Sequence, residues 1–73
     1  MTDIDWHKLA TNTIKVELAR SGIGYEELIR CLEAIGINES YTGIAAKINR
    51  GTFSFAFFMQ CMKALGVVNI RLD

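Results

Sequence analysis

The sequence contains no proline, one histidine and one tryptophan among its 73 residues, and its formal net charge is zero. The histidine, His7, has no other histidine or cysteine at ligand spacing, so we expect no metal site. There is also no glycine-rich phosphate-binding loop and no nucleophile with a base nearby in sequence. We therefore expect no cofactor and no enzymatic activity.

Long apolar runs and paired cysteines are also lacking. No stretch of about 18 apolar residues is present that could span a bilayer. The first ten residues lack the charged start and apolar centre of a signal peptide. The two cysteines, Cys31 and Cys61, each lie within an apolar helical pattern, which favours buried free thiols over a disulfide. Together these features predict a cytoplasmic protein without a membrane partner.

The charges are unevenly distributed along the chain although their total is zero. Residues 1–39 contain four basic and seven acidic side chains, whereas residues 40–72 contain four basic side chains and no acidic one. A one-sided field of this kind can orient a molecule on a polyanion even when the net charge is nil. The charge distribution therefore leaves a nucleic-acid partner open.

Apolar residues recur at helical spacing along the whole chain, which we interpret as one domain, residues 1–73. The spacing predicts helices at about 6–21, 25–35, 40–50 and 55–65. We expect their N-caps to include Asp5, Ser54 and either Asn38 or Ser40. We also expect Trp6 and Tyr41 to be buried. Glycine just past a helix end adopts a left-handed conformation without a steric penalty, which fits the four predicted stops at Gly22, Gly36, Gly51 and Gly66.

The last two predicted elements suggest a second subunit. The helix at 55–65 is apolar over more than one face, so it is either central to the domain or shared with a partner chain. In the tail, apolar and polar residues alternate, which predicts a strand at about 67–72 whose simplest partner is the same strand of a symmetry mate. We expect a homodimer with an interface formed by Phe55, Phe57, Met59, Val68, Ile70 and Leu72.

Three segments of the chain resemble the helix-turn-helix domain of the phage-repressor and Cro (XRE) class. They are "SGIGYEELIRCL", "GIAAKINRG" and "FSFAFFMQCMKALGV", which cover most of residues 21–67. The chain is also similar to an uncharacterised family of small bacterial proteins, through Trp6, "IKVEL", "YEEL", "KINRG", "FSFAFF" and "ALGV". The resemblance implies an all-α fold, a four-helix lambda-repressor-like domain to which we add the short C-terminal β-strand.

The resemblance also implies a function. The helix at 40–50 would enter the major groove of double-stranded DNA, and the protein would be a dimeric transcriptional regulator. Small side chains on that helix would permit close approach, basic ones would contact bases or phosphates, and Tyr25 would lie near the DNA backbone. The implied DNA-binding residues are Tyr25, Thr42, Gly43, Ala46, Lys47 and Arg50.

A second interpretation belongs to another class. The fold could serve as a protein-interaction or dimerisation module without DNA binding. Zero net charge and the broad apolar surface of the helix at 55–65 favour this alternative.

Overall fold

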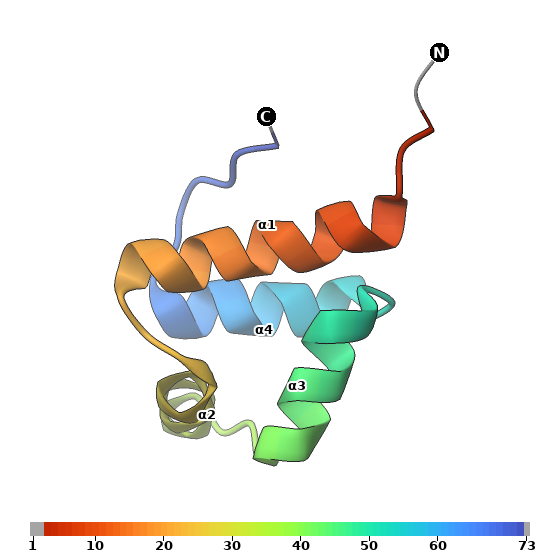
Figure 1. Cartoon of the computed structure of the whole chain (residues 1–73). Helices are drawn as coiled ribbons and strands as arrows, with labels where there is room; N and C mark the ends of the chain where they lie inside the picture. Colours follow the sequence, from red (N-terminus) through yellow and green to blue (C-terminus); the bar gives the residue numbers. More distant parts are fainter. Residues whose placement is uncertain (1–2, 73) are drawn as a thin grey trace.

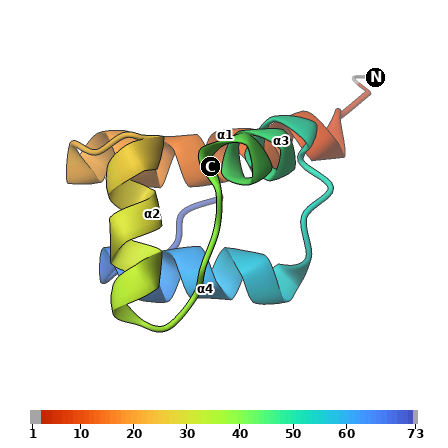
Figure 2. The ribbon, with the colours of Figure 1, turned by 90° about the horizontal axis from the view of Figure 1, so that it is seen from below.

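The structure is a computed structural model that describes residues 3–72 (Figure 1). Four helices make up the fold, which confirms the all-α prediction: α1 (Trp6–Ser21), α2 (Tyr25–Ala34), α3 (Tyr41–Arg50) and α4 (Phe55–Leu65). Seen from below, α1 and α3 lie together on one side of the domain and α4 lies on the other, while α2 spans the distance between them at one end (Figure 2).

Local signals in the sequence determine where the helices begin. The Asp5 carboxylate accepts a hydrogen bond from the backbone N–H of Lys8, and the hydroxyls of Ser40 and Ser54 cap α3 and α4 in the same way. These contacts satisfy backbone donors that have no partner within the helix. Three of the helices, α1, α3 and α4, end at a glycine in the left-handed conformation, as the sequence predicted.

Every helix contributes to a single hydrophobic core. α1 and α2 each supply an isoleucine or leucine pair, α3 supplies two isoleucines, and α4 supplies an aromatic ring with two sulfur-containing side chains. The buried residues are Ile14, Leu18, Leu28, Leu32, Ile44, Ile48, Phe57, Cys61 and Met62. Because Ile44 and Ile48 are fully buried, the side of α3 opposite them is held facing outward.

Two aromatic residues are not buried as the sequence predicted. Trp6 is 67% exposed and Tyr41 is 54% exposed. The buried face of α1 is centred on Ile14 and Leu18, and Trp6 lies to one side of that face on a second apolar stripe. Tyr41 begins α3 and stacks edge-on against Tyr25 instead of entering the core. The prediction of burial was therefore wrong for both.

The tail also differs from the prediction. No strand is present among residues 3–72, and the predicted strand at 67–72 is instead an irregular segment that runs back past the outer side of α1 (Figure 1). A strand needs a neighbouring backbone to accept and donate hydrogen bonds, and within the described residues no segment pairs with the tail in that way. The alternation of apolar and polar residues in the tail was therefore not enough to produce a strand.

Candidate nucleic-acid interface

The outward side of α3 forms a shallow depression built mainly from small side chains. The buried isoleucines on the opposite side fix the rotation of the helix about its axis. The residues that line the depression are Tyr41, Thr42, Ala45, Ala46, Asn49 and Arg50. Thr42, Ala46 and Arg50 were predicted from the sequence to lie together on an exposed face, and the structure places them so. Asn49, an exposed amide in the same depression, was not among the predicted contacts.

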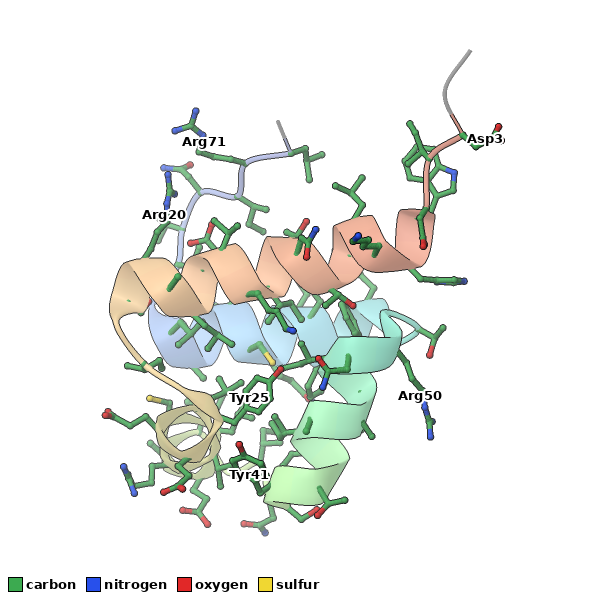
Figure 3. The ribbon with its side chains drawn as sticks, viewed as in Figure 1. Asp3, Arg20, Tyr25, Tyr41, Arg50 and Arg71 are labelled. Atoms are coloured by element: carbon green, nitrogen blue, oxygen red, sulfur yellow. The ribbon has the colours of Figure 1, made fainter. Side chains whose placement is uncertain are left out.

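Tyr25 joins α2 to this surface. Its ring contacts the ring of Tyr41 edge-on, with the centroids 5.7 Å apart, and Figure 3 shows both phenols in the angle between α2 and α3. Burial, and then the neighbouring Tyr41, raise the pKa of Tyr25 above its ordinary value. The Tyr25 hydroxyl therefore keeps its proton at neutral pH and can donate a hydrogen bond to an anion.

Lys47 is exposed but is engaged by neighbouring side chains. Its ammonium group forms an ion pair with the Glu39 carboxylate at 2.6 Å and lies 4.8 Å from the centre of the Phe57 ring. Glu39 belongs to the turn between α2 and α3, and Phe57 belongs to α4. Lys47 therefore connects three parts of the fold, and its predicted contact with DNA stays a prediction.

Gly43 likewise has a structural reason rather than a ligand-binding one. A side chain added at Gly43 would approach the Ser40 hydroxyl to 3.0 Å and the Glu39 carboxylate to 3.5 Å. The same hydroxyl accepts the hydrogen bond from the Gly43 backbone N–H that caps α3. The absence of a side chain at this position therefore leaves room for the cap, and close approach of DNA at Gly43 stays a prediction.

The charge around the depression is mixed. Arg50 projects from the C-terminal end of α3, away from the two tyrosines (Figure 3). A second depression beside Tyr25 and Tyr41 is lined by Glu26, Glu27 and Arg30. The two glutamates begin α2, where the helix dipole favours negative charge. A phosphate would consequently be attracted at the Arg50 end of the surface and repelled at the start of α2.

Cys61 lies in the hydrophobic core of the domain. Burial, with a smaller contribution from the charge of Glu39, raises the pKa of the Cys61 thiol to about 12. The thiolate, which is the reactive form, is therefore strongly disfavoured at neutral pH. Cys31 and Cys61 are both free, and Cys31 is half-buried.

The predicted dimer residues are divided between the core and the surface. Phe57 is only 4% exposed and packs within its own domain, so its assignment to a dimer interface is corrected: the ring has no free face for a partner. The others are exposed hydrophobic side chains on α4 and the tail, namely Phe55, Met59, Val68, Ile70 and Leu72.

The described part of the chain offers neither a cluster of metal-ligating side chains nor a helix able to cross a membrane. Residues 3–72 contain no group of three or more histidine, cysteine, aspartate or glutamate side chains that could hold a metal ion. None of the helices in this range has the length and apolar character needed to cross a membrane.

The fold and its outward-facing third helix define a small all-α domain. The chain belongs to the family described as "Domain of unknown function (DUF6471)", whose model matches residues 6–70. No curated protein and no solved structure matches the chain. Membership of this family agrees with the similarity to an uncharacterised family found in the sequence and does not bear on the resemblance to the phage-repressor and Cro class.

Proposed function

We propose that the protein binds double-stranded DNA with α3 in the major groove, as a helix-turn-helix domain of the phage-repressor and Cro type, and that it regulates transcription. The observation that carries the proposal is the outward face of α3. It presents small and polar side chains, is fixed in rotation by Ile44 and Ile48, and packs beside α2. An α-helix with such a face fits the width of the major groove.

The side chains at this surface suit different parts of a duplex. The methyl groups of Thr42 and Ala46 can contact the methyl group of thymine, and the amide of Asn49 can pair with adenine through two hydrogen bonds. Arg50 can hold a phosphate at one end of this surface, and the Tyr25 hydroxyl can donate a hydrogen bond to a second phosphate, against the repulsion from Glu26 and Glu27. Lys47 and Gly43 are not among these contacts, because both are engaged within the fold.

Fluorescence anisotropy with a random duplex, at about 50 and about 200 mM salt, tests the proposal. We expect binding that weakens as salt rises and that is lost by at least tenfold in Ala46→Glu. The matched control is Ala56→Glu, the same change on the exposed start of α4, which should bind within about twofold of wild type. Absence of salt-dependent binding, or equal effects of the two substitutions, would refute DNA reading by α3.

The alternative function, a dimerisation module without DNA binding, is favoured by one observation. Exposed apolar side chains also gather on α1 and the tail, away from the depression on α3. Self-association with no salt-dependent DNA binding in the same titration would select this alternative.

A further inference from the structure

A second apolar stripe runs along the outer side of α1. Trp6, Leu9, Thr13, Val16 and Arg20 follow one another at alternating spacings of three and four residues, which places them on one face of the helix. The three apolar members are 67%, 37% and 50% exposed, although each lies in a well-formed helix. This spacing is typical of a seam between two helices, and the domain itself supplies no helix to cover it.

Charges of opposite sign lie at the two ends of this stripe, and the Arg20 guanidinium, which pairs with Glu17 at 3.8 Å, remains half-exposed. Figure 3 shows Arg20 and Arg71 together near the C-terminal end of α1 and Asp3 near its N-terminal end. Arg20 and Arg71 also line one cleft with Leu9 and Val16, between α1 and the tail. A surface with an acidic end and a basic end is complementary to a copy of itself that runs in the opposite direction.

We propose that this face, formed by the outer stripe of α1 and the adjoining tail, binds a second copy of the chain. The two α1 helices pack antiparallel about a twofold axis between Asn12 and Thr13. In that register Leu9 faces Val16 of the second copy, and Asp5 faces Arg20. Apolar contacts then form the centre of the interface, and opposite charges close both of its ends.

This interface differs from the one predicted from the sequence, which relied on α4 and a paired strand. Here the tail contributes beside α1 without forming a strand. The side chains Trp6, Leu9 and Val16 offer less area than the roughly 800 Å² that each partner buries in a standard interface. We therefore expect a dimer that dissociates on dilution.

The arrangement is compatible with the proposed function but does not depend on it. α1 and α3 lie on the same side of the domain (Figure 2). A twofold axis perpendicular to that side makes the α1 helices antiparallel and leaves both α3 helices on one face of the dimer. Sedimentation without DNA tests dimerisation separately from DNA binding.

Sedimentation equilibrium of the full chain, over about 5 to 500 µM, is the first test. We expect a monomer–dimer equilibrium in the wild-type protein, and a dissociation constant at least tenfold higher in Val16→Gln. The control Lys15→Gln, on a different face of α1, should leave the dimer dissociation constant within twofold of the wild-type value. Circular dichroism verifies that each variant folds. A wild-type protein that is monomeric throughout, or equal effects of the two substitutions, would overturn the proposal.

Disulfide trapping tests the register directly. In a Cys31→Ser background, Thr13→Cys places a thiol beside the proposed axis, where two copies should cross-link under mild oxidation. Lys8→Cys, exposed but on another face of α1, should remain monomeric. Cross-linking through Lys8→Cys and not through Thr13→Cys would exclude the antiparallel pairing, even if the protein proves to be a dimer.

Discussion

At the level of single residues, Gly51 has the tightest environment of any glycine in the described chain. It ends α3 with φ +68°, and a side chain added there would collide with the backbone carbonyl of His7. Close by, the Thr11 hydroxyl donates a hydrogen bond to the Ile48 carbonyl oxygen at 2.5 Å. Gly51 therefore permits the close approach of α1 to the end of α3, in addition to its left-handed conformation.

We predict that Gly51→Ala destabilises the protein by about 3 kcal/mol or more. About 1 kcal/mol of this comes from the left-handed conformation and the rest from separating α1 and α3. Gly66→Ala is the matched control, because Gly66 has φ +74° but no atom within 4 Å of the added side chain. It should cost only about 1 kcal/mol. Urea denaturation measures both values, and equal losses would contradict the close-approach explanation.

Cys61 makes the stability of the fold dependent on pH in the alkaline range. Its pKa is raised from an ordinary value of 9.0 to about 12, so the thiol ionises in the unfolded chain before it ionises in the folded one. The stabilisation is complete below pH 9 and is lost as the pH rises towards 12, with a slope of at most about 1.4 kcal/mol per pH unit.

We expect the free energy of unfolding to fall between pH 9 and pH 10 in the wild-type protein, and to fall less steeply in Cys61→Ala. The comparison uses the slope and not the absolute stability, because removing a buried thiol also leaves a cavity. Tyr25, with its own raised pKa, is present in both proteins and contributes equally. Identical slopes in urea denaturation series would show that Cys61 does not retain its proton on folding.

At the level of the helix, α3 carries two basic residues with different surroundings. Lys47 pairs with Glu39 and covers Phe57, whereas Arg50 lies exposed at the edge of the outward depression. We predict that Lys47→Met costs about 1 kcal/mol of stability and leaves DNA binding nearly unchanged. Arg50→Met should leave stability within about 0.5 kcal/mol and weaken DNA binding several-fold. Thermal denaturation measures the stability of the two variants, and anisotropy measures their DNA binding. If Lys47→Met weakened DNA binding and Arg50→Met did not, Lys47 would be the residue that contacts DNA.

The helix ends were predictable because they depend on near neighbours in sequence. Ser54 caps α4 three residues ahead of the backbone N–H it binds, and the Phe53 and Phe58 rings pack across that start with centroids 6.5 Å apart. The surroundings of Lys47 were not predictable. Its partners lie eight residues back in a turn and ten residues ahead in another helix, and periodicity along α3 carries no information about either.

At the level of the whole molecule, the sequence correctly indicated exposed apolar side chains on α4 and the tail but missed the exposed apolar stripe on α1. Trp6 was expected in the core because the predicted buried face of α1 included both Ile14 and Trp6. In the structure Ile14 is fully buried and Trp6 lies on a neighbouring, exposed stripe of the same helix. Which stripe of α1 becomes buried depends on where α3 and α4 cross α1, and that position is fixed only by the packing of the complete domain. The predicted strand failed for the related reason that pairing requires a second backbone.

Dimerisation through α1 and DNA binding through α3, if both hold, are coupled at this scale. The proposed dimer would present two copies of Arg50 and Tyr25, so it would contact about twice as many phosphates as a monomer. We predict that Val16→Gln, which adds no charge and lies on α1 away from α3, weakens DNA binding and roughly halves its salt dependence at protein concentrations near the dimer dissociation constant. Anisotropy titrations at four salt concentrations give this slope. If Val16→Gln dissociates the dimer but leaves the slope unchanged, each subunit binds DNA alone and the two surfaces act independently.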